Sequence, residues 1–268
     1  MKAPHHWHQA MVVVVPDGVS SERVEGAIAT LWTHHDALRL SFGDKPINTD
    51  AGKPPKLAQI DLTHLTETEQ AQAIADHGTK LHQDVNLAVG GLMRTALFTR
   101  GANRPWLLLS LHHLVVDAVS WQILLGDLGM LLDGTAQLPE KTTSFKTWSE
   151  TLRETTRQAE ADFWLTQVEQ PTVQLPRAET VLPTEATTQT VTVALSQEDT
   201  HALLQTVPAI YNTQINDALL TALAQTLLQW AGVTSGSVRI ELEAHGREQI
   251  TPELDVSRTV GWFTTTYP

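Results

Sequence analysis

Two strand-like runs joined by a short turn constrain the fold of this chain more than any other feature. Apolar residues dominate 93–99 and 106–111, and the Gly-Ala-Asn-Arg-Pro sequence at 101–105 has the composition of a turn, so we expect a hairpin. Directly afterwards, apolar residues recur at helical spacing, and Gly134 is a natural helix stop. The residues on that helical face are Ile123, Leu124, Leu128, Leu131 and Leu132. A hairpin leading into such a helix predicts an α+β fold with two layers in each lobe.

Further elements are expected before the hairpin. The run of valines at 12–15 predicts a buried strand, closed by a Pro-Asp-Gly turn. Ser20 or Ser21 can cap the helix that follows. Thr66 and Glu69 have the spacing of a capping box and predict the start of another helix.

A Thr-, Pro- and Glu-rich stretch at 135–187 suggests a division of the chain near residue 175. Alternating residues at 191–195 and 238–242 predict two strands beyond it, and a helix is expected from Asn216 or Asp217 to Trp230. The two predicted domains are residues 1–175 and 176–268.

Composition excludes several classes of function. The 268 residues carry a net charge of −12, and no Lys/Arg cluster forms a stripe that could follow phosphates, so nucleic acid is not an expected partner. The absence of cysteine excludes disulfides, thiolate metal sites and a cysteine nucleophile. No apolar run approaches the roughly 20 residues needed to cross a bilayer, and the N-terminus lacks the pattern of a signal peptide. We therefore expect a cytoplasmic protein without a membrane partner.

The first cluster with chemical potential is His112, His113 and Asp117, where the second hairpin strand leads into the helix. Such strand ends expose reactive groups on a rigid support. A histidine, with an unperturbed pKa of about 6.5, can act as a general acid or base near neutral pH. Asp117 could cap the helix, orient the turn or hold an imidazole. The spacing alone leaves a catalytic histidine and a pair of structural histidines about equally open.

Two other segments are weaker candidates for a catalytic site. The Glu-Ala-His-Gly-Arg-Glu sequence at 243–248 follows the last clear strand. It could aim a carboxylate into a cleft, although a solvated turn with internal ion pairs is the commoner explanation. In 257–264, Gly261 beside two aromatic residues predicts a bend or a close backbone approach, or simply core packing.

We expect no metal site. The remaining histidine groups are His5, His6 and His8, and the pair His34 and His35. Zinc requires convergent ligands, and adjacent histidines on one element rarely reach the same ion. The chain also lacks a Gly-rich phosphate loop and a Gly-x-Ser-x-Gly nucleophile elbow.

Taken together, these motifs resemble the condensation superfamily of nonribosomal peptide synthetases. Residues 112–121 read His-His-Leu-Val-Val-Asp-Ala-Val-Ser-Trp, which contains the shared His-His-x-x-x-Asp signature and is similar to the epimerization branch. Residues 243–248 and 258–264 match that branch's Glu-Gly-His-Gly-Arg-Glu and Arg-Thr-Val-Gly-Trp-Phe-Thr segments, apart from Ala244 in place of Gly. Two smaller departures are Ala118 and Gln122, where Gly and Arg are common. Further similar segments are 34–40, 141–145 and 217–220.

The resemblance implies a two-lobed chloramphenicol-acetyltransferase-like fold whose second lobe is incomplete here, because domains of this family continue well beyond Pro268. It also implies inversion of an aminoacyl or peptidyl thioester at Cα, with His113 and Glu243 as the catalytic acid/base pair. The supporting residues would be His112, Asp117, Ser120, Trp121, His245, Arg247 and Arg258.

The implied partners are a peptidyl carrier protein domain and the adjacent synthetase domains. No cofactor would bind this chain permanently, because the carrier domain supplies the substrate on its 4'-phosphopantetheine arm. Two other functions stay open: a condensation domain that forms peptide bonds, and a non-catalytic module that only binds the carrier.

Overall fold

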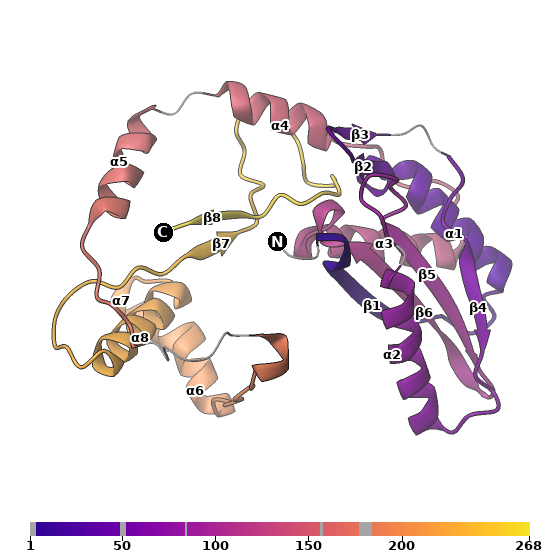
Figure 1. The fold of residues 1–268 in the computed structure, drawn as a ribbon, viewed down its shortest axis with the longest axis horizontal. Helices are drawn as coiled ribbons and strands as arrows, with labels where there is room; N and C mark the ends of the chain where they lie inside the picture. Colours follow the sequence, from indigo (N-terminus) through magenta and orange to yellow (C-terminus); the bar gives the residue numbers. More distant parts are fainter. Residues whose placement is uncertain (1–3, 49–51, 84, 156–157, 177–183) are drawn as a thin grey trace. The chain divides into compact units, whose positions relative to one another are not determined.

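A computed structural model of the chain describes residues 4–48, 52–83, 85–155, 158–176 and 184–268 (Figure 1). The chain divides into two compact units, the first comprising Met1–Thr156 with Glu243–Thr266 and the second Arg157–Leu242 with Tyr267–Pro268. This division differs from the predicted 1–175 and 176–268. The difference arises because ion pairs of Arg247 and Arg258 with residues far away in the chain join 243–266 to the first unit, and no local pattern reveals such pairs.

A four-stranded sheet with the order β1-β6-β5-β4 lies at the centre of the first unit. Its strands are β1 (His8–Val14), β4 (Leu57–Asp61), β5 (Met93–Arg100) and β6 (Asn103–His112). The predicted hairpin is confirmed, since β5 and β6 pair antiparallel with Met93 opposite Leu111. β1 also runs antiparallel to β6, whereas β4 is parallel to β5. A separate small hairpin joins β2 (Leu40–Phe42) and β3 (Pro46–Asn48).

Helices cover both faces of this sheet. They are α1 (Ser21–His34), α2 (Glu67–Gln83) and α3 (Ala118–Asp133). A further helix, α4 (Phe145–Glu154), packs instead through Trp148 against Val256 and Phe263. Leu107 and Leu109 of β6 lie in one apolar cluster with residues of α1 and α3, whereas the intervening Leu108 packs in a second cluster with Ile74 of α2. Alternate side chains of a strand point to opposite faces. The first unit therefore has three layers, where the sequence pattern predicted two.

The valine run near the N-terminus is buried on one side only, with Val13 packed against the core. β1 is the edge strand next to β6, and Val12 and Val14 are 46% and 52% exposed. Only Val15, just past the strand, is fully buried. The expectation of a buried strand was wrong because a continuous apolar run does not tell an edge strand from a central one.

The helix termini follow the predicted chemistry. The Ser20 hydroxyl accepts the Arg23 N–H and caps α1. Thr66 and Glu69 exchange the hydrogen bonds of a capping box at the start of α2. Gly134 ends α3 in the left-handed region, with φ of 105°. Among the described helices, none is long and apolar enough to cross a membrane.

The second unit is largely helical. Its helices are α5 (Gln158–Glu169), α6 (Gln197–His201), α7 (Val207–Tyr211) and α8 (Ile215–Trp230). It also contains the 3-10 turn η4 (Glu185–Thr187) and a π-helical stretch, η5 (Ala202–Thr206), between α6 and α7. The 3-10 turns of the first unit are η1 (Pro4–His6), η2 (Asp36–Arg39) and η3 (His113–Val115). α8 confirms the predicted helix, and Gln214 and Asp217 form a capping box at its start.

The two strands predicted at 191–195 and 238–242 are not formed as expected. Val191 and Val193 are 88% and 89% exposed, and no other described segment pairs with 191–195. Alternation indicates a strand only where a neighbouring strand satisfies its backbone groups. Downstream, the strand is β7 (Leu242–Ala244), displaced toward the C-terminus and paired with β8 (Thr265–Tyr267).

Candidate functional site

The end of β6 presents the two adjacent histidines differently. His112 is 1% exposed, and its Nε2 lies 2.7 Å from the Pro4 carbonyl while its Nδ1 accepts the Leu114 N–H over 3.2 Å. Burial is the main cause that holds the pKa of His112 below its ordinary value. Because both ring nitrogens are engaged and the neutral form is favoured, His112 is a structural residue that shapes the turn.

His113 is only partly buried, and aromatic rings surround it. Its backbone N–H donates to the Trp7 carbonyl over 2.8 Å, and its ring contacts those of Trp7 and Trp262. Of the two histidines, His113 is thus the one whose imidazole is not held by hydrogen bonds within the described part of the chain.

Asp117 caps α3 and binds the distant segment 243–266. Its Oδ1 accepts the Ser120 N–H over 2.7 Å, which is an N-cap hydrogen bond. Its Oδ2 accepts the backbone N–H of Phe263 over 3.1 Å, and Arg247 donates to both oxygens over 3.1 and 3.3 Å. Of the roles considered for Asp117, the helix cap is the one that this geometry shows, and the ion pair with Arg247 adds a second.

Arg247 holds its own segment together as well. Its second guanidinium nitrogen donates to the carbonyls of Val256 and Thr259 over 3.0 and 2.7 Å, and the guanidinium lies 4.0 Å from the centre of the Phe263 ring. Burial lowers the pKa of Arg247, and the neighbouring Asp117 opposes that shift. Arg247 is therefore an anchor that fixes 243–266 against the start of α3.

Ser120 and Trp121 complete this anchor. The Ser120 hydroxyl donates to the Gly261 carbonyl over 2.8 Å and accepts hydrogen bonds from Arg247 and from the Gly261 N–H, each over 3.0 Å. The Trp121 indole N–H donates to the Gln9 side chain of β1 over 2.7 Å. Both residues are buried, which makes them supports for the site rather than groups that meet a substrate.

Glu243 and His245 lie at the exposed end of the same segment. Glu243 is exposed in β7, and no ion pair or hydrogen bond within the described residues holds its carboxylate. The His245 side chain is 57% exposed, and its Nδ1 accepts the Arg247 N–H over 2.9 Å. The carboxylate of Glu243 is thus exposed to solvent, whereas His245 shapes the turn.

Two glycines allow the close backbone approaches on which this packing depends. Gly246 has φ of 66°, and a Cβ added there would lie 1.8 Å from the Phe263 carbonyl oxygen. A Cβ at Gly261 would lie 2.5 Å from the Phe145 ring. Of the alternatives left open at Gly261, the structure shows close packing of aromatic side chains against the glycine.

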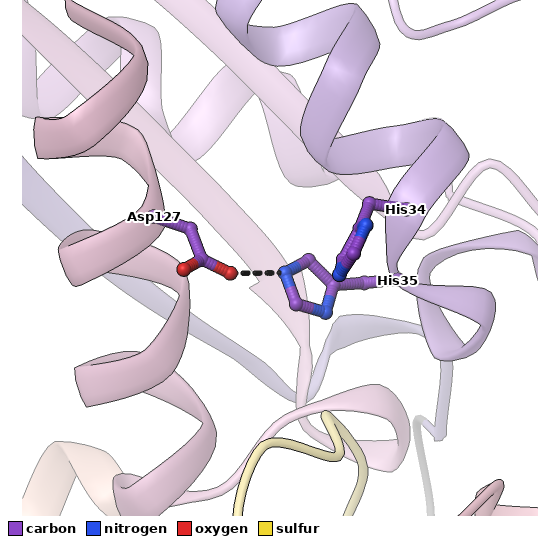
Figure 2. A group of neighbouring side chains, drawn as sticks. All are labelled: His34, His35 and Asp127. Carbon is purple, nitrogen blue, oxygen red and sulfur yellow. Dashed lines mark hydrogen bonds and ion pairs between the residues drawn. The ribbon is translucent and has the colours of Figure 1, made fainter. Parts of the chain in front are cut away.

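Arg258 anchors the segment at a second point on α3, namely Asp127. Figure 2 shows Asp127 together with its neighbours His34 and His35. Arg258 donates to Oδ1 of Asp127, whose Oδ2 lies 2.9 Å from His35 Nε2. The ligand atoms of His34, His35 and Asp127 all lie within 4.8 Å of one another, a convergence that the sequence pattern did not predict. Both carboxylate oxygens of Asp127 nevertheless already have N–H partners, His35 and Arg258. The positive charge of the Arg258 guanidinium also opposes the binding of a metal cation. The geometry is therefore that of an ion-pair cluster around a buried aspartate rather than that of a metal site.

A cavity of about 500 Å³ opens beside this cluster. Its polar side includes His34, Lys141 and Arg258, and its apolar side includes Phe42 and Phe145. Lys141 is already paired with Asp36 over 2.8 Å. His113 is not part of its lining.

Sequence reasoning missed Trp7 and Asp127. Asp127 stands three and four residues after Leu124 and Ile123 on the buried face of α3, so its position in the apolar stripe was a signal that it needed a buried partner. No local pattern connects Trp7 with a histidine more than a hundred residues away.

The model of the condensation-domain family matches residues 1–268, and the chain belongs to that family. It is 42% identical over its whole length to chondramide synthase cmdD of Chondromyces crocatus, and 35% identical over 98% of its length to gramicidin S synthase 1 of Brevibacillus brevis. It spans 7% and 25% of these two proteins.

Among solved structures, the epimerization domain from the third module of tyrocidine synthetase B is similar, with a TM-score of 0.88 and 33% identity. The similarity covers 99% of this chain and 63% of that domain. The condensation-type fold expected from the sequence is confirmed, and the chain is a condensation-type domain of the kind found in nonribosomal peptide synthetases.

Proposed function

We propose that this chain inverts the α-carbon of an aminoacyl or peptidyl thioester, as an epimerization domain. One structural observation carries the proposal. Arg247, four residues after Glu243, is buried against Asp117, four residues after His113. The two segments that bear the candidate acid/base groups are therefore held by one ion pair at the start of α3.

Inversion requires that one group removes the Cα proton and another returns a proton from the opposite face. The thioester makes that proton more acidic than an ester or an amide would, and the electron pair left by deprotonation delocalises into the carbonyl as an enolate. His113 and Glu243 come from different segments and carry no competing hydrogen bond among the described residues, which suits two opposed acid/base groups. His112, Asp117, Ser120 and Arg247 support them without touching the substrate.

The proposed partner is a peptidyl carrier protein domain of a synthetase. Its 4'-phosphopantetheine arm would bring the thioester to His113, and the chain itself would hold no permanent cofactor. The match to synthases several times longer than this chain supports neighbouring domains in the same polypeptide.

A condensation reaction is the second candidate, because the family model that matches is described as a condensation domain. Product analysis separates the two: inversion returns a stereoisomer of the loaded amino acid, whereas condensation yields a longer chain. Binding of the carrier with neither product would favour a non-catalytic module.

The catalytic assignment is tested by comparing three variants on a carrier-bound aminoacyl thioester with chiral analysis of the released amino acid. We expect His113→Ala and Glu243→Ala each to abolish inversion, and His112→Ala to reduce it less. Near-normal inversion by Glu243→Ala would contradict the two-group scheme.

A further inference from the structure

Three aromatic rings meet at the candidate catalytic histidine: that of His113 itself and the indoles of Trp7 and Trp262. The ring centres of Trp7 and His113 are 4.7 Å apart, those of His113 and Trp262 are 4.9 Å apart, and those of the two indoles are 5.0 Å apart. Each ring therefore contacts the other two. The two tryptophans come from the segment before β1 and from the segment anchored by Arg258 and Arg247.

The imidazole of His113 lacks the usual device that orients a functional histidine. Such a ring is commonly held by a hydrogen bond from one nitrogen to a carbonyl or carboxylate. Here Nδ1 is buried, and no partner for it exists among the described residues. A nitrogen buried in this way cannot reach a substrate, so proton exchange has to pass through Nε2.

We propose that Trp7 and Trp262 are positioning residues that clamp the His113 ring and direct its Nε2 toward the substrate. This inference rests on the proposed acid/base role of His113. The indoles replace an orienting hydrogen bond by ring contacts, which favour particular relative orientations of the paired rings. The backbone hydrogen bond from His113 to the Trp7 carbonyl fixes the position of the His113 backbone, from which the side chain extends. The two indole rings therefore need to restrict only the rotation of the imidazole about its side-chain bonds.

The clamp has a spectroscopic signature that does not depend on activity. In the chain labelled with ¹⁵N, the carbon-bound ring protons of His113, assigned by their loss in His113→Ala, are expected at upfield positions because two indole ring currents act on them. Trp262→Leu and Trp7→Leu should each move these signals toward ordinary histidine values. Trp32→Leu is the control, since the Trp32 indole N–H, like that of Trp262, has no partner among the described residues, while ring contacts with His113 are formed by Trp7 and Trp262.

The same variants test the positioning role in catalysis. We expect Trp262→Leu to lower kcat for inversion by about 10- to 100-fold with little change in KM, because misplacing a catalytic group by about 1 Å costs rate rather than binding. Trp262→Phe, which keeps a ring, should recover most of kcat, and Trp32→Leu should keep both constants wherever it folds.

The possible failures are distinguishable. If the upfield signals of His113 are present and respond to both tryptophan variants, but wild type gives no inversion, the clamp stands and the proposed function fails. If wild type inverts its substrate and Trp262→Leu keeps full kcat, or if the His113 signals are at ordinary positions, the clamp is overturned.

Discussion

Arg247 donates to both carboxylate oxygens of Asp117, over 3.1 and 3.3 Å, and the two side chains are only 6% and 3% exposed. The pair joins the beginning of α3 to a segment 130 residues later in the chain. Removing one partner from a buried ion pair leaves the other charge without compensation, which is far more costly than removing an exposed pair.

We therefore expect Arg247→Met to lower the free energy of unfolding by about 3–5 kcal/mol, measured by urea denaturation. The matched control is Arg104→Met, because Arg104 pairs with Asp17 over 3.1 Å while both side chains are largely exposed. That change should cost at most about 1 kcal/mol. Equal effects of the two substitutions would contradict the anchoring role of Arg247.

Gly246→Ala is predicted to destabilise the first unit more than Gly101→Ala. Both glycines have similar positive φ, 66° and 69°, so the backbone strain of about 1–2 kcal/mol is shared. Only at Gly246 does the new Cβ meet backbone, namely the Phe263 carbonyl oxygen, whereas no atom lies within 4 Å at Gly101. Thermal unfolding of the two variants measures the difference, and indistinguishable midpoints would show that the segment can shift to relieve the clash.

The depressed pKa of His112 predicts a loss of stability in mild acid. Above pH of about 6.5 the residue is neutral in both the folded and the unfolded chain and contributes no pH dependence. As the pH falls below that value, the unfolded chain binds a proton that buried His112 does not, so stability decreases until the folded pKa is reached. Urea denaturation between pH 7.5 and 5.5 should show a smaller loss for His112→Gln than for wild type. A parallel pH dependence of the two proteins would contradict this.

The cluster of His34, His35 and Asp127 is predicted not to bind zinc. Its carboxylate already accepts from His35 and Arg258, so a metal ion would have to displace both partners. We expect the thermal midpoint of wild type to be unchanged by added Zn²⁺. A saturable rise that Asp127→Asn and His34→Ala both abolish would instead establish a metal site.

The sequence sufficed wherever the deciding interactions are local. The hairpin of β5 and β6, the capping box at Thr66 and the end of α3 at Gly134 depend on residues close together in the chain, and all three were predicted. The placement of the His-His-x-x-x-Asp motif between the end of β6 and the start of α3 was predicted in the same way.

What the sequence could not show depends on residues far apart. The pairing of Arg258 with Asp127 and the contact of Trp7 with His113 each span more than a hundred residues and leave no periodic signal. The alternation of side chains at 191–195 wrongly predicted a strand. A strand also needs a neighbouring strand to pair with, and a local pattern does not show whether one is present.

The most direct test of the account is the incorporation of deuterium at Cα of a carrier-bound aminoacyl thioester in heavy water, read by mass spectrometry with chiral analysis, for wild type and His113→Ala. Acid/base catalysis by His113 predicts incorporation accompanied by inversion in wild type and neither in the variant. Inversion without incorporation of solvent deuterium, or incorporation that persists in His113→Ala, would contradict acid/base catalysis by His113.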